Sequence, residues 1–184
     1  ERADVALLVL DATTGITAQD SHVAGFILDA YKSVAIIVNK WDAVENKQTG
    51  TVEAYTQAIR EQLRFLDYAP VLTVSALTRQ RVSKILPLAL MIAEQRRARI
   101  PTGELNRLVR EAVQAHPAPN RQGKQLKFLY ATQAETEPPT FVLFVNDRAL
   151  VHFSYARYLE NRIRSAFPFI GTPLRLEFRN RKEG

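Results

Sequence analysis

Ser33-Val34-Ala35-Ile36-Ile37-Val38-Asn39-Lys40-Trp41-Asp42 joins an uninterrupted apolar run to a short polar turn. A continuous apolar run is typical of a strand that is covered on both faces, as in parallel sheets. Two similar runs, at residues 5–10 and 70–75, lie before and after it. Stretches with helical spacing separate the three runs, at residues 23–30 and 52–66. This alternation predicts parallel strands joined by right-handed crossovers.

Local signals predict where the helices begin. Thr17, followed three residues later by Asp20, is typical of a capping box at a helix start. Pro87 lies inside the helical stripe at residues 82–93, so we expect a kink or a late start there. Thr102 is expected to cap a further helix as its N-cap residue.

The pattern changes near residues 98–101, where we place a domain boundary between residues 1–100 and 101–184. The second part predicts a helix, two strands, a helix and a strand, which lie at residues 102–112, 126–133, 140–146, 155–163 and 174–178. In the last strand apolar and charged residues alternate, which indicates one buried and one wet face. We expect a small α+β unit with its helices on one side of a sheet.

The composition is that of a soluble globular protein, with 46% hydrophobic and 24% charged residues. Cysteine is absent, which excludes disulfides, cysteine-ligated zinc and thiol nucleophiles. No apolar run approaches the ~18 residues of a membrane span, so we expect no membrane partner. Residues 101–184 carry 13 basic and 8 acidic side chains, against 12 and 11 in residues 1–100. A basic half suits nucleic acid as a partner, although a solvated surface explains the same charge.

Asn39-Lys40-Trp41-Asp42 follows the central apolar run directly and is a candidate guanine-binding motif. The Asp42 carboxylate can accept hydrogen bonds from N1–H and the 2-amino group of guanine, a donor pair that adenine lacks. The Lys40 stem can cover a face of the base, and Asn39 can tie the loop to neighbouring backbone. Ligands bind at the carboxyl ends of strands in open α/β sheets, as this position requires.

Ser75-Ala76-Leu77 ends the next predicted strand, where a backbone N–H of Ser75 or Ala76 can reach the guanine O6. Trp41 occupies the variable position of the motif and is expected to pack beside the loop, although stacking on a base is the alternative. We count Asn39, Lys40, Trp41 and Asp42, with these two loop residues, as the candidate guanine-binding set.

These motifs together resemble a known family. Asp4–Ala12, Gly15-Ile16-Thr17-Ala18-Gln19-Asp20, Asn39-Lys40-Trp41-Asp42 and Ser75-Ala76-Leu77 resemble the second GTPase domain of the Der (EngA) family. Tyr130-Ala131-Thr132-Gln133, the stretch at 139–146 and Gly171-Thr172-Pro173 are similar to that family's C-terminal KH-like domain. The resemblance covers essentially the whole chain.

The resemblance implies an α/β fold, with part of a P-loop-type GTPase domain over residues 1–100 and a small α+β KH-like domain over residues 101–184. It implies a bacterial, cytoplasmic protein that acts in assembly of the large (50S) ribosomal subunit. The implied partners are the large subunit or its rRNA and other GTPase domains of the same polypeptide. GTP or GDP and Mg²⁺ are the implied cofactors of the intact parent.

One part of the family pattern is absent. The chain contains no Gly-x-x-x-x-Gly-Lys-Ser/Thr loop, which cradles the phosphates and supplies a magnesium-binding hydroxyl. It begins at Glu1 and enters a strand-like run almost at once, so we expect it to be part of a longer protein. We expect no catalytic residue, no metal ligand, no bound nucleotide and no GTP hydrolysis in this chain alone.

The second domain also departs from the KH pattern. RNA-binding KH domains clamp the backbone with a Gly-x-x-Gly loop, and the chain has none. Charge alone then selects the candidate RNA contacts, which are Arg121, Lys124, Lys127, Arg175 and Arg179. A solvated face, or a docking surface for another domain, is the alternative. Tyr130, Phe141 and Phe144 can stack on bases, but packing in the core or at a strand edge explains them as well.

Two functions therefore stay open from the sequence. The first is a ribosome-assembly GTPase, of which this chain is the C-terminal part. The second is a non-enzymatic RNA- or protein-binding module with a vestigial guanine motif. A phosphate-binding loop upstream in the parent reading frame would decide between them.

Overall fold

A computed structural model describes residues 3–118, 120 and 123–181 of the chain. The described residues form two compact units. The first contains the chain up to Arg96 together with Ile170–Pro173, and the second contains Arg97–Phe169 and the described residues from Leu174 onward. Each unit has its own three-stranded sheet.

The sheet of the first unit consists of β1 (Val5–Asp11), β2 (Ser33–Asn39) and β3 (Val71–Thr73), in that spatial order. All neighbouring strands are parallel, as the alternation of strand and helix predicts. Six of the seven residues of β2 are buried, because this strand has a neighbour on each side and helices on each face. The expected parallel α/β arrangement is therefore confirmed.

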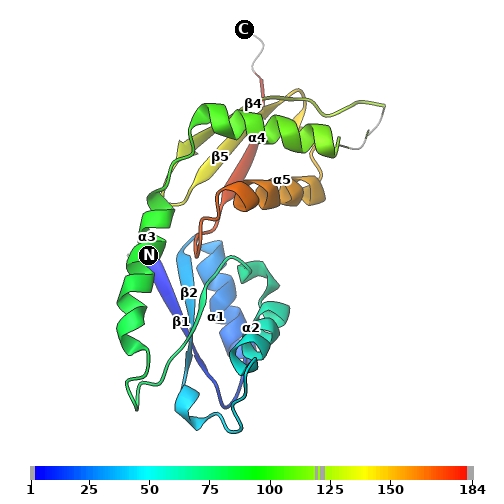
Figure 1. Cartoon of the computed structure of the whole chain (residues 1–184). Coiled ribbons are helices and arrows are strands. Elements are labelled where there is room, and N and C mark those ends of the chain that lie inside the picture. The colour runs from blue at the N-terminus through cyan, green and yellow to red at the C-terminus, as the bar shows by residue number, and fades with distance from the viewer. Residues whose placement is uncertain (1–2, 119, 121–122, 182–184) are drawn as a thin grey trace. The chain divides into compact units, whose positions relative to one another are not determined.

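Three helices cover this sheet (Figure 1). Helices α1 (Ala18–Asp29) and α2 (Thr51–Gln62) pack on one face, where Ala24 and Ile59 join a core with alternate β2 residues. Helix α3 (Ile85–Arg97) packs on the other face through Ile92. Short 3₁₀ turns complete the chain at η1 (Trp41–Ala43), η2 (Arg64–Leu66), η3 (Val82–Lys84) and η4 (Arg148–Leu150).

Strand β1 differs from the expectation of a strand covered on both faces. Leu8 and Leu10 are buried in the core beneath α1 and α2, but Leu7 is 42% and Val9 56% exposed. Among the described residues β1 pairs only with β2, and the core that α3 joins includes Val5 of β1 but neither Leu7 nor Val9.

The helix starts follow the local signals in two of three cases. Thr17 and Asp20 form the expected capping box at the start of α1. Helix α3 begins at Ile85, which places Pro87 in its first turn, so the expected late start is confirmed. The prediction that Thr102 is the N-cap is wrong. The preceding residue, Pro101, is the N-cap of α4, and its carbonyl accepts a hydrogen bond from the Leu105 amide (3.0 Å).

The second unit has the predicted order of a helix, two strands, a helix and a strand. Its elements are α4 (Thr102–Ala115), β4 (Phe128–Glu135), β5 (Thr140–Val145), α5 (Phe153–Ala166) and β6 (Arg175–Asn180). The central strand β5 pairs antiparallel with β4 and parallel with β6. Phe141, Leu143 and Val145 share one core with residues of both helices, so α4 and α5 cover the same face of the sheet.

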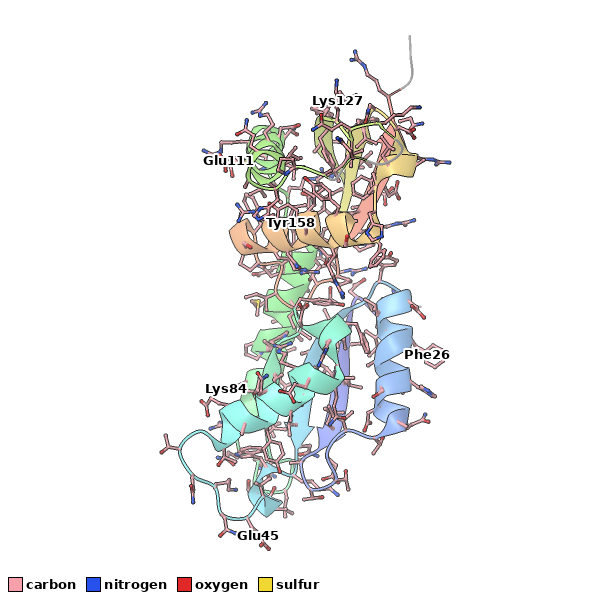
Figure 2. The ribbon with its side chains drawn as sticks, turned by 90° about the vertical axis from the view of Figure 1, so that its right-hand side faces the viewer. Phe26, Glu45, Lys84, Glu111, Lys127 and Tyr158 are labelled. Carbon is pink, nitrogen blue, oxygen red and sulfur yellow. The ribbon has the colours of Figure 1, made fainter. Side chains whose placement is uncertain are left out.

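The two helices of the second unit are joined by Tyr158, which projects from α5 toward α4 (Figure 2). Its hydroxyl donates to the carbonyl of Ala112 on α4 (2.9 Å).

Within the described residues, no helix is long and apolar enough to cross a membrane.

The segment Ile170–Pro173 packs with the first unit, although it lies more than 70 residues after Arg96 in the sequence. Gly171 donates its amide to the Tyr68 carbonyl (2.8 Å) and accepts from the Val34 amide (2.7 Å). Its φ is +68°, and a Cβ at this position would lie 2.7 Å from Ile92 Cγ1 and 2.9 Å from the Val34 carbonyl oxygen. Only glycine therefore fits here without displacing α3 or β2.

Replacing Gly171 by alanine should lower the free energy of unfolding of the first unit by about 2–5 kcal/mol, from the left-handed backbone and the close contacts together. Gly15→Ala is the matched control, because Gly15 also has positive φ (+72°) but no neighbour within 4 Å of the added Cβ. It should lose only about 1–2 kcal/mol. Urea unfolding of both variants measures the difference, and equal losses would contradict the contact at Gly171.

Candidate functional site

The candidate site begins directly after Asn39, the last residue of the central strand β2. The backbone turns at Lys40, whose φ of 59° and ψ of 32° are left-handed, and continues into η1. Hydrogen bonds to the residues that directly follow β1 and β3 hold this turn. The Ala12 amide donates to the Asn39 carbonyl (2.9 Å), and the Trp41 amide donates to the Val74 carbonyl (3.0 Å). A left-handed backbone conformation is unfavourable for a residue other than glycine. The two hydrogen bonds stabilise this conformation at Lys40.

Asn39 joins this loop to the loop that follows β3. Its Oδ1 accepts a hydrogen bond from the Ala76 amide (3.0 Å), which confirms that Asn39 ties the loop to neighbouring backbone. Ser75 is fully buried, and its hydroxyl accepts from the Thr78 amide (3.0 Å). The Ala76 amide is thus engaged with Asn39, so its predicted contact with the guanine O6 would require this bond to be shared.

Asp42 has one carboxylate oxygen that lacks a hydrogen-bond donor within the described part of the chain. Its Oδ1 is buried and has no hydrogen-bond partner among the described residues. An ionised carboxylate can only accept, and a buried acceptor without a donor costs about 1–3 kcal/mol or more for a charged group. A group with N–H donors that reached this oxygen would remove that cost.

Two residues that the sequence did not single out support the loop. The Lys47 ammonium donates to the carbonyl of Trp41 (2.7 Å). Tyr55 on α2 meets the Trp41 ring edge to face, with the centroids 5.1 Å apart, and donates its hydroxyl to the Ala12 carbonyl (3.0 Å). Trp41 is 4% exposed, so it packs beside the loop as expected. Tyr55 was visible only as part of a helical stripe, and nothing in the sequence marks Lys47.

Lys40 makes an ion pair with Asp11, the last residue of β1, at 2.6 Å between Nζ and Oδ2. The other carboxylate oxygen accepts from the Thr13 amide (2.9 Å) and hydroxyl (2.7 Å). The hydrogen bond from Lys40, followed by those from Thr13, lowers the pKa of Asp11 to about 2. The ion pair holds the Lys40 stem across the ends of β1 and β2, beside the loop that carries Asp42.

The six candidate guanine-binding residues therefore lie on the two loops that follow β2 and β3. Asn39 and Ala76 contact each other directly. That these six residues bind guanine stays a prediction.

Comparison with known proteins places the chain in a family. Residues 1–115 match the GTP-binding domain of elongation factor Tu, and residues 99–179 match the KH-domain-like C-terminal region of EngA bacterial GTPase enzymes. GTPase Der of Alkaliphilus metalliredigens is 51% identical over 98% of this chain and 41% of its own length. The chain belongs to the Der (EngA) family. The Der proteins of Thermomicrobium roseum and Chloroflexus aggregans are 52% and 50% identical, each over 99% of this chain and 40% of their own length.

The candidate RNA contacts of this Der-family chain occupy two places in the second unit. Lys124 and Lys127 are exposed in the segment before β4, where Figure 2 shows Lys127 beside the sheet. Arg175 and Arg179 lie on β6 and share the carboxylate of Glu177, at 3.3 Å and 2.7 Å. Arg121 lies outside the described residues. The structure thus brings Arg175 and Arg179 together around Glu177, which lies between them on the wet face that the alternation predicts.

The Asp11–Lys40 ion pair makes the stability of the fold depend on pH through the pKa of Asp11. Because the pKa of Asp11 in the folded chain, about 2, lies below its ordinary 3.8, the pair stabilises the fold above roughly pH 4 and is lost as the pH falls through about 2. Lys40→Met should raise the pKa of Asp11 toward 3.8. Thr13→Val should raise it less, since the amide still donates.

Carboxyl-carbon NMR titration of the three proteins measures these pKa values. If Asp11 of the unmodified chain titrates near 3.8, the ion pair does not persist in solution.

Proposed function

We propose that this chain is the C-terminal part of a Der-type GTPase and that its strand-end loops recognise the guanine base of GTP or GDP. The observation that supports this most directly is the buried, unpartnered Oδ1 of Asp42. It lies in a loop that backbone hydrogen bonds attach to the residues directly after β1 and β3, so the carboxylate is positioned before any ligand arrives.

The chemistry of recognition follows from these groups. Asp42 would accept from N1–H and the 2-amino group of guanine, while the Lys40 stem, stretched toward Asp11, covers a face of the base. Asn39 positions the two loops relative to each other and does not need to touch the base. Adenine offers no such donor pair and would leave the carboxylate unpaired, which costs enough to discriminate strongly.

The phosphates and Mg²⁺ need further residues, because the chain has no phosphate-binding loop. We propose that the intact parent supplies them in sequence beyond this chain, as the greater length of the Der relatives suggests. No residue of this chain is assigned a catalytic role, and hydrolysis is proposed for the parent alone.

For the whole protein we propose a role in assembly of the large (50S) ribosomal subunit in the bacterial cytoplasm. The C-terminal domain would contact the large subunit or its rRNA, supported by the net charge of +5 that residues 101–184 carry. Other GTPase domains of the same polypeptide are the proposed further partners. The missing phosphate loop favours a second candidate, a non-enzymatic RNA- or protein-binding module with a vestigial guanine motif.

Asp42→Asn in the intact parent should shift the preference of the second GTPase domain from guanine toward xanthine nucleotides. The amide adds a donor where xanthine has a carbonyl in place of the 2-amino group. Competition between XDP and GDP measures the shift, with Lys47→Gln as a control that touches only the backbone carbonyls of this loop. An unchanged preference for GDP would show that Asp42 does not recognise the base.

This chain alone should bind GTP and GDP only weakly, because the phosphates and Mg²⁺ supply most of the charge interactions in this class. Calorimetry at micromolar protein should detect no tight complex. Submicromolar affinity would contradict the proposed division of the site between this chain and the rest of the parent.

A further inference from the structure

The sheet of the second unit has one face without a helix of that unit on it. Phe141, Leu143 and Val145 of β5 enter the core beneath α4 and α5. The alternating residue Phe144 therefore points to the other face, together with its register partners Tyr130 on β4 and Arg179 on β6.

This second face combines aromatic rings with arginines, although Thr140 and Val142, which share it with Phe144 on β5, are buried. Tyr130 is 48% exposed, and its ring lies 6.1 Å from that of Phe144 between centroids. Arg179 follows in the same cross-strand row, and Arg175 lies four residues earlier on the same face of β6. Both arginine side chains are about half exposed, at 48% for Arg175 and 58% for Arg179.

Glu177 lies between the two arginines and contacts both. The hydrogen bond from Arg179 lowers the pKa of Glu177, whose carboxylate contacts both guanidinium groups. One N–H of Arg179 is used in this way, and a guanidinium carries several more that suit phosphate oxygens. Two guanidinium groups share one carboxylate, so the row Arg175–Glu177–Arg179 keeps a net positive charge.

We propose that this face, formed by Tyr130, Phe144, Arg175 and Arg179, is a binding platform for single-stranded RNA. The inference rests on the RNA contact proposed for the C-terminal domain and assigns it a surface. An unpaired base would stack on Tyr130 while Arg179 contacts the adjoining phosphate. Such stacking needs an exposed base face, which a duplex does not offer, and it replaces the glycine clamp that this chain lacks.

Tyr130→Ala should weaken binding of the full chain to a labelled oligouridine strand about 5- to 100-fold, as expected for the loss of one base–aromatic stack. Tyr130→Phe keeps the ring and should restore binding. Phe153→Ala is the matched control, because Phe153 is also an exposed aromatic of this unit (78%) but lies on α5. It should leave the affinity unchanged.

Arg179→Gln should weaken binding of both oligouridine and an RNA duplex and should lower the slope of log affinity against log salt by about 0.7–0.9. Tyr130→Ala should hardly change duplex binding or that slope. Fluorescence anisotropy over a salt series measures all of these quantities, with thermal unfolding as a check that each variant is folded.

The outcomes separate this inference from the function on which it rests. If the unmodified chain binds RNA, but Tyr130→Ala loses no more affinity for oligouridine than Phe153→Ala, then this face is not the platform and charge-based contact stands. If neither RNA binds at low salt, the platform and the proposed RNA contact both fail, and a protein-docking surface is favoured instead.

Discussion

The backbone hydrogen bonds on either side of Lys40 are the constraint on which the candidate site depends. They attach Asn39 to the segment after β1 and Trp41 to the segment after β3, so the loop is held by both neighbours of the central strand. A left-handed turn at a lysine would otherwise relax. With the turn held, Asn39 reaches the Ala76 amide and Asp42 is placed with one buried oxygen unpaired. Position and chemistry of the site thus follow from the register of three parallel strands.

The side chains around the loop that follows β2 are of two kinds. Most of them stabilise the loop, and one, Asp42, is positioned by it. Lys47, Tyr55 and the Asp11–Lys40 pair bond to backbone or to each other, and each has its partners within the chain. Asp42 differs, since its Oδ1 has none among the described residues. A fold that satisfies its other loop groups and leaves one carboxylate oxygen buried is consistent with a ligand that brings its own donors.

The sequence predicted what depends on short-range pattern. The buried run of β2, the guanine motif after it and the Thr17 capping box need only neighbouring residues to be recognised. The sequence did not predict features that depend on contacts between residues far apart in the chain. The Asp11–Lys40 pair, for example, requires β1 and β2 to be aligned. The alternation of residues 174–179 placed Glu177 on the same wet face as Arg175 and Arg179, but the ion pairs among them depend on side-chain conformations that the pattern does not contain.

Recognition of guanine by the strand-end loops is the central claim, and this chain can test it without its parent. The measurement is a ¹⁵N NMR titration with GMP, IMP and AMP, which share ribose and phosphate but differ at the base edge. GMP should shift the amides of Asp42 and Ala76 and the Trp41 indole, IMP should bind more weakly because it lacks the 2-amino donor, and AMP should leave these signals in place. Equal shifts for all three nucleotides, or shifts elsewhere only, would contradict the claim.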